Sequence, residues 1–198
     1  MLTLKGFSRL AFIISSLVVY LWSGTGIAGY ESNAEIDALQ KSDCFSTVGI
    51  HYQSKGGEFT SFSSNFIGLD AYYPAGTKFK LEHITREEIQ LTELQNNRKL
   101  KIIFNPKHHN FDSQALVLKL FSIKAPETVK GFSTLESQSM SSGKVYVGIS
   151  RKALSLAIGF PPDSINTIST ADAEVFQVKR FNKVKFLFKN EKVVKIED

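Results

Sequence analysis

The stretch that decides the fold begins at residue 143 with G-K-V-Y-V-G-I-S-R-K-A-L-S-L-A-I-G-F-P-P and closes at residue 198 with V-V-K-I-E-D. Ser150 suits a helix N-cap, because its hydroxyl can accept a hydrogen bond from an amide of the first turn. Gly159 suits a left-handed C-terminal cap, and Pro161 cannot continue a helix. Between the caps, apolar residues recur at helical spacing on one face: Ala153, Leu154, Ala157 and Ile158. The stretch predicts a helix of about nine residues that depends on packing for its stability.

Three strands are predicted after this helix, at residues 174–179, 183–189 and 192–196. In the middle strand, apolar residues alternate with lysines, so the two kinds of side chain point to opposite faces. The connections are short, which favours antiparallel hairpins. We expect the helix to cover the face that carries Phe186 and Phe188, leaving the lysines in water.

This pattern resembles the SmpA/OmlA (BamE-like) domain family over about the last 60 residues. Phe176 stands where that family usually has Trp or Tyr in its first strand, and Glu191 stands where it has a turn glycine. The residues that match are Gly148, Ser150, Leu154, Gly159, Pro161, Phe186, Phe188, Val193 and Ile196. The resemblance implies an α+β module that binds other proteins, either in outer-membrane protein assembly or, as in similarly folded inhibitors, by binding an enzyme.

The N-terminal segment, residues 1–28, has the pattern of an export signal or a membrane anchor. Lys5 and Arg9 precede an apolar run from Leu10 to Trp22, and small residues follow up to Ala28. Extending the run to residue 27 allows an uncleaved anchor, so both interpretations stay open. No cysteine follows the run to accept a lipid. We expect an exported protein, periplasmic or envelope-associated, whose contact with the membrane is confined to residues 10–27.

The middle of the chain predicts a mostly β module. After a linker or a first helical turn at residues 29–44, the module spans 45–124, and its alternating runs favour a meander or a small SH3-like barrel. Asp112 can cap a helix at residues 113–122, which we expect to lie between the two modules. Ser133 and Glu136 have the spacing of a capping box, which predicts a helix at the start of a second module, 131–198. The boundary between the modules is expected near residues 125–131.

Composition excludes some functions. The formal net charge is +5, and no cluster of basic residues with interleaved aromatics stands out, so nucleic-acid binding is not expected. The one cysteine, Cys44, has no partner for an intramolecular disulfide, and we interpret it as a small buried apolar residue. The basic run from Lys179 to Lys185 is interpreted as an exposed strand face.

No motif for a phosphate loop, a catalytic nucleophile or a metal site is present, so we predict no catalytic residue, cofactor or metal. The sequence indicates a non-catalytic binding or adaptor protein of the envelope, in outer-membrane assembly or maintenance, with an envelope protein as its partner. The candidate partner-binding residues are Tyr72, Tyr73, Lys179, Arg180 and Lys183.

Two alternatives stay open. The first is an envelope hydrolase whose site is built from His83, His108, His109 and nearby acids. The second is a β module that binds a cell-wall fragment.

Overall fold

The structure, a computed structural model, describes residues 33–126, 131–163, 172–179 and 182–197. Residues from Ser32 onward group into one compact unit that contains both helices and sheets, so the predicted α+β class is confirmed. The predicted export signal or anchor lies outside the described residues. Among the helices that are described, none has the length and apolar character needed to cross a membrane.

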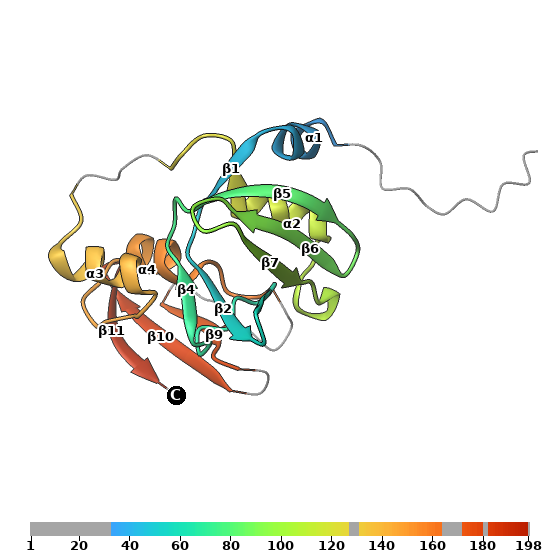
Figure 1. The fold of residues 1–198 in the computed structure, drawn as a ribbon. Coiled ribbons are helices and arrows are strands. Elements are labelled where there is room, and N and C mark those ends of the chain that lie inside the picture. Colours follow the sequence, from blue (N-terminus) through green and yellow to red (C-terminus); the bar gives the residue numbers. More distant parts are fainter. Residues whose placement is uncertain (1–32, 127–130, 164–171, 180–181, 198) are drawn as a thin grey trace, which may run out of the picture. The chain divides into compact units, whose positions relative to one another are not determined.

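The larger sheet is built mostly from the first half of the described chain (Figure 1). Its neighbours follow the order β4-β2-β3-β7-β6-β5-β1-β8. The strands are β1 (Asp43–Ser46), β2 (Ile50–Lys55), β3 (Glu58–Phe62), β4 (Ala71–Tyr73), β5 (Lys78–Ile84), β6 (Glu88–Glu93), β7 (Arg98–Ile103) and β8 (Phe121–Ser122). The predicted meander corresponds to β5, β6 and β7, which are antiparallel neighbours. The parallel pairing of β3 with β7 was not predicted.

The larger sheet closes on itself. Strands β1 and β2 follow one another with a short bend, and so do β4 and β5. Strand β2 pairs with β4, and β1 pairs with β5. The continuous segment β1–β2 therefore runs antiparallel to the continuous segment β4–β5, and this pairing joins the two ends of the sheet. At the bend, the amide of Ser46 donates to the carbonyl of Thr77 at 2.9 Å, and the amide of Gly76 donates to Ser46 at 2.7 Å.

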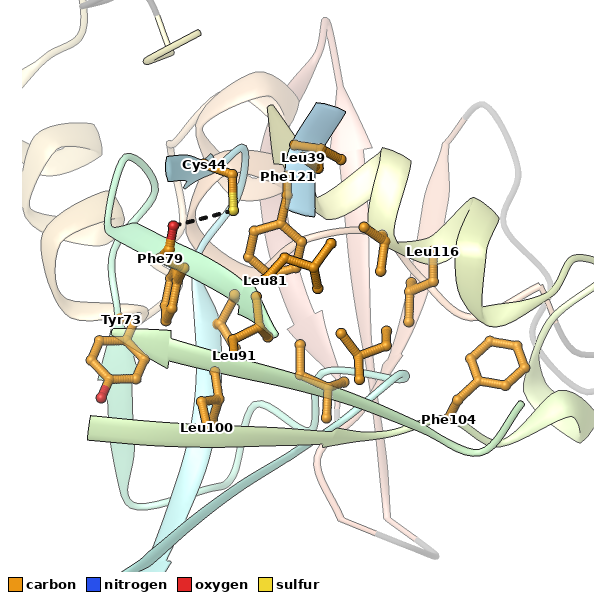
Figure 2. Packing of buried hydrophobic residues seen from close by; sticks show 14 of the residues in the cluster. Leu39, Cys44, Tyr73, Phe79, Leu81, Leu91, Leu100, Phe104, Leu116 and Phe121 are labelled. Carbon is orange, nitrogen blue, oxygen red and sulfur yellow. Dashed lines mark hydrogen bonds between the residues drawn. The ribbon is translucent and has the colours of Figure 1, made fainter. Parts of the chain in front are cut away.

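The first hydrophobic core fills the inside of this sheet. In β5, Phe79 and Leu81 are buried while Lys78 and Lys80 are exposed, so the alternation in sequence becomes an inner and an outer face. Figure 2 shows Phe79, Leu81, Leu91 and Leu100 converging with Phe121 and Leu116. Cys44 lies in the same cluster, fully buried, with its sulfur 3.4 Å from the carbonyl oxygen of Phe79.

Two segments in this part differ from the prediction. Residues 29–44 were expected to be a linker or a first helical turn, but Asn33 caps a full helix, α1 (Ala34–Lys41), which buries Ile36 and Leu39 against the core. The helix predicted at 113–122 is shorter: α2 (Ser113–Leu120) ends where the chain turns into β8, whose Phe121 and Ser122 pair with β1. Leu116 of α2 belongs to the first core. A short 3-10 helix, η1 (Pro106–His108), precedes α2.

The C-terminal part confirms the prediction made from residues 143–198. Helix α4 (Arg151–Ile158) has the expected N-cap, with the Ser150 side chain accepting from the amide of Ala153. Gly159 is its C-cap, but with φ of 79° and ψ of −148° it does not adopt the expected left-handed helical conformation. It lies on a separate antiparallel sheet of order β11-β10-β9, formed by β9 (Ala173–Gln177), β10 (Lys183–Lys189) and β11 (Lys192–Glu197). Phe186 and Phe188 face this helix in a second hydrophobic core.

The predicted capping box is also confirmed. Ser133 accepts from the amide of Glu136, and the Glu136 carboxylate accepts from the amide of Ser133 at 2.8 Å, at the start of helix α3 (Thr134–Ser142). The same carboxylate accepts from the amide of Ser150 at 3.0 Å, which ties α3 to the cap of α4. Hydrogen bonding with the Ser150 side chain, followed by that with the Ser133 amide, lowers the pKa of Glu136 to about 2. The predicted boundary at 125–131 falls largely on residues outside the described part, and the two-module organisation stays a prediction.

Arg151 lies at the rim of the second core and holds it through charged contacts. Its guanidinium lies 3.8 Å from the ring centre of Phe188 and pairs with the carboxylates of Glu174 and Glu191. Because the Glu174 side chain is largely buried, Arg151→Ala would leave a poorly solvated charge and remove a cation–π contact. We expect a loss of about 2 kcal/mol in unfolding free energy, measured by chemical denaturation.

Lys152→Ala is the matched control for this change, since Lys152 is exposed on the same helix. It should alter the free energy of unfolding by less than about 0.5 kcal/mol. Equal effects of the two substitutions would show that the Arg151 contacts do not stabilise the fold.

Candidate functional site

The two tyrosines predicted to bind a partner lie inside the fold. The Tyr72 hydroxyl is 2.8 Å from the carbonyl oxygen of Met140 and 2.9 Å from that of Ala157, and it can donate to one of them at a time. Burial raises the pKa of this hydroxyl. Tyr73 is 6% exposed and stacks on Tyr52 with ring centres 4.4 Å apart. Tyr73 is therefore buried, whereas Tyr72 is half-buried with its hydroxyl held inside the fold.

Two of the three basic residues predicted with them, Lys179 and Lys183, are exposed. Lys179 is exposed and borders a surface hollow of about 490 Å³ that also includes Phe62 and Phe66. Lys183 is exposed at the start of β10, opposite Gln177 of β9. Arg180 lies outside the described residues. Of the five predicted residues, therefore, Lys179 and Lys183 are shown at the surface.

The outer face of the three-stranded sheet is basic. Five lysines and two glutamates lie between residues 183 and 197, a net charge of +3 (5 − 2). Lys185 and Lys195 both contact the carboxylate of Glu197, at 3.7 Å and 2.8 Å, and these contacts lower its pKa. One carboxylate thus serves two ammonium groups, and the face keeps an excess of positive charge.

Strand β11 is the edge of this sheet, and only its beginning is covered. The amide of Val193 donates to the carbonyl of Ile149 at 2.9 Å, and the amide of Gly148 donates to Val193 at 2.7 Å. Beyond Val193, β11 has no further strand neighbour on its outer side within the part of the chain that the structure describes. At the opposite edge, the amide of Ile67 donates to the carbonyl of Gln177, the last residue of β9, and the amide of Gly68 donates to Val178 just beyond it.

Apolar side chains gather at the open edge. Val194 is 48% exposed and Ile196 is 36% exposed on β11, and Val147, next to the segment that pairs with Val193, is 54% exposed. An uncovered strand with aliphatic side chains can accept another strand by backbone pairing. We call this region the β11 surface and define it by Val147, Lys185, Val194, Lys195 and Ile196.

A hydrogen-bonded seam joins the two cores, and Asn65 is its centre. The Asn65 side chain accepts from the amide of His51 at 2.8 Å and donates to the carbonyls of Gly49 at 2.9 Å and Ile158 at 2.7 Å. Asn65 is 8% exposed and has a φ of 44°, a left-handed conformation that asparagine tolerates better than most residues. Sequence analysis missed this residue.

Close backbone approach completes the seam. The amide of Gly49 donates to the carbonyl of Leu156 at 2.8 Å, which ties the bend before β2 to α4. A Cβ atom on Gly49 would collide with the Tyr72 hydroxyl and with the carbonyl oxygen of Ala157. His51, 4% exposed, packs on the Tyr72 ring with centres 4.9 Å apart. Desolvation lowers the pKa of His51 to about 4, opposed by a hydrogen bond with the backbone of Gly143.

The histidines considered for a hydrolase do not form one site. His83 is exposed on β5, and His108 ends the 3-10 helix η1. His109 lies between the rings of Phe104 and Phe111, at 5.4 Å and 4.8 Å, and desolvation is the main reason that its pKa falls to about 4. Among the described residues, no three His, Cys, Asp or Glu side chains gather closely enough to hold a metal ion.

Cys44 is buried, and the structure bears out its interpretation as a small core residue. Burial, reinforced by the neighbouring charge of Asp43, raises the pKa of its thiol to about 11. The thiolate, which is the reactive form, is therefore scarce at neutral pH.

Comparison of the chain with family models, with curated proteins and with solved structures finds no match.

Proposed function

We propose that this chain is an exported envelope protein that acts as a non-catalytic adaptor, and that it binds an acidic, extended segment of a partner protein along β11. The observation that supports this most is the β11 surface, where an uncovered strand edge, exposed Val194 and Ile196, and an excess of lysines coincide. Backbone pairing would supply the register, the aliphatic side chains would bury apolar area, and the lysines would favour carboxylates.

The finer architecture belongs to the same proposal. We infer that the C-terminal residues form a BamE-like domain, because the capped helix α4 lies on a three-stranded sheet through Phe186 and Phe188. The family resemblance then suggests a role in outer-membrane protein assembly or maintenance. For the first part of the chain we propose a small β barrel, because the larger sheet closes on itself.

Site-specific cross-linking in the exporting cell tests the adaptor function. A benzophenone amino acid is placed at Val194, and as a control at Leu94, which is also exposed but lies at the end of β6 in the larger sheet. We expect one discrete envelope protein to be linked from Val194 through an extended acidic segment, and not from Leu94. Reversing charge with Lys185→Glu and Lys195→Glu should weaken this product.

The adaptor function would be contradicted if both positions linked the same set of proteins, or if Val194 gave no product. A product that resisted the charge reversals would contradict the acidic nature of the partner segment.

A further inference from the structure

The outer face of the larger sheet is hollowed into a groove that the protein-partner function does not use. The groove has a volume of about 550 Å³, within the range of sites that hold small ligands. It crosses β3, β6 and β7, where Thr60 pairs with Lys101, Lys101 pairs with Gln90, and Lys99 pairs with Thr92. The Gly56–Gly57 turn borders one end, and Glu82 of β5 lines one side.

The groove is lined by both polar and apolar residues, the latter being Phe59, Leu91 and Leu100, and its formal charges cancel. Two carboxylates, of Glu58 and Glu82, and two ammonium groups, of Lys99 and Lys101, belong to the lining. Thr60 and Thr92 add hydroxyls, and Gln90 adds an amide. The Thr92 hydroxyl donates to Glu82 at 3.0 Å, and Lys101 pairs with Glu88 at 3.2 Å, so several of these groups are already held in place. Preorganised groups lose less freedom when a ligand binds.

The strand neighbours of the closed sheet match those of a circularly permuted OB-fold, a five-stranded barrel. If β1 with β2 and β4 with β5 are each counted as one strand, the closed order is β1/β2, β3, β7, β6, β4/β5. An OB barrel has the same cycle, with its third and fifth strands parallel, and β7 and β3 take these places. Helix α2 follows β7, as a helix follows the third strand of an OB barrel.

In OB barrels the face of the second and third strands, with the loops beside it, binds oligonucleotides or oligosaccharides. These strands correspond here to β6 and β7, and the loop between the fourth and fifth strands corresponds to the Gly56–Gly57 turn. The hollow in the sheet and the ligand face expected from the strand order therefore coincide.

We propose that this groove binds a linear, uncharged oligosaccharide. A polyanion such as single-stranded nucleic acid would meet the carboxylates of Glu58 and Glu82, and a polycation would meet Lys99 and Lys101. Sugar hydroxyls both donate and accept, so they match carboxylates, ammonium groups, hydroxyls and the amide together. This binding is separate from the proposed contact at β11, and either can fail without the other.

Titration of the full chain with chitohexaose and with cellohexaose, followed by amide NMR shifts, tests the proposal. We expect at least one sugar to bind, with shifts at residues 58–60, 90–92 and 99–101. The double variant Thr60→Val with Gln90→Ala removes two hydrogen-bonding groups and should bind about tenfold more weakly. Gln95→Ala, which changes an exposed glutamine in the turn after β6, should bind as the unchanged chain does.

Lys99→Ala is a second test that does not depend on the fold of the double variant, because Lys99 is exposed. It should weaken binding about threefold. The proposal is overturned if neither sugar binds at millimolar concentration, if the shifts fall outside the groove, or if the groove variants bind as well as Gln95→Ala does. Tighter binding of oligo(dT) at the same residues would overturn the ligand class.

Discussion

Replacing Asn65 by aspartate is expected to destabilise the protein by about 3–4 kcal/mol. The change keeps the size of the side chain and its acceptor for the amide of His51, but it removes both donors. The carbonyls of Gly49 and Ile158 would then face a carboxylate in a site where Asn65 is 8% exposed. Buried acceptors without donors and a buried unpaired charge both raise the free energy of the folded state.

Asn97→Asp is the matched control, because Asn97 also has a positive φ, 53°, but lies exposed in the turn between β6 and β7. It should change the free energy of unfolding by less than about 0.5 kcal/mol. Urea denaturation followed by circular dichroism measures both variants. A small effect of Asn65→Asp, similar to that of the control, would contradict the role given to the seam.

Acidification is expected to weaken the fold by up to about 3 kcal/mol through His51 alone. The unfolded state takes up a proton near the ordinary pKa of 6.5, whereas desolvation lowers the pKa of folded His51 to about 4. Stability is therefore full above pH 6.5, falls as the pH drops toward 4, and has lost the whole contribution below that. His109, with its pKa also lowered to about 4, should add a loss in the same window.

The pH dependence can be assigned with variants. Unfolding free energies are measured between pH 7.5 and 5. Glu136, whose pKa is about 2, does not titrate in this range, so the pH dependence there reports the histidines. His51→Gln should flatten part of the slope, whatever its stability at neutral pH, and His109→Gln should flatten another part. A slope that is unchanged in His51→Gln would show that the His51 ring is protonated in the fold as readily as in the unfolded chain.

The C-terminal part was predictable because its signals are local. Ser150 and Gly159 mark the ends of α4, and the alternation around Phe186 determines which face of β10 packs on it. The capping box at Ser133 is likewise formed by residues that lie within four positions of each other. In each case the residues that form the structure are neighbours in the sequence, so periodicity and spacing suffice.

The rest depends on contacts between distant residues. The parallel pairing of β3 with β7 joins segments about 40 residues apart, as in Thr60 with Lys101, and alternation within a strand does not specify its neighbour. Asn65 looks in sequence like an ordinary turn residue, yet it bonds to Ile158 across the seam. Tyr52, Tyr72 and Tyr73 were candidates for an aromatic contact surface, with core packing expected for at least one of them. The sequence does not show which one, because the Tyr72 hydroxyl meets carbonyls of α3 and α4 and Tyr73 stacks on Tyr52 only in the fold.

The seam also bears on function. If the two cores form one cooperative unit, the groove on β6 and β7 and the β11 surface are held in a fixed relation. Both proposed binding surfaces then share one frame, and that frame depends on the seam.

Native-state hydrogen exchange of the full chain measures whether the two cores open together. We predict that the slowest amides of β6 and β10 share one opening free energy, and that Asn65→Asp lowers both by the same amount. If β10 instead opened with its own lower free energy, and Asn65→Asp left β6 unchanged, the two cores would be independent modules and the seam would not couple them.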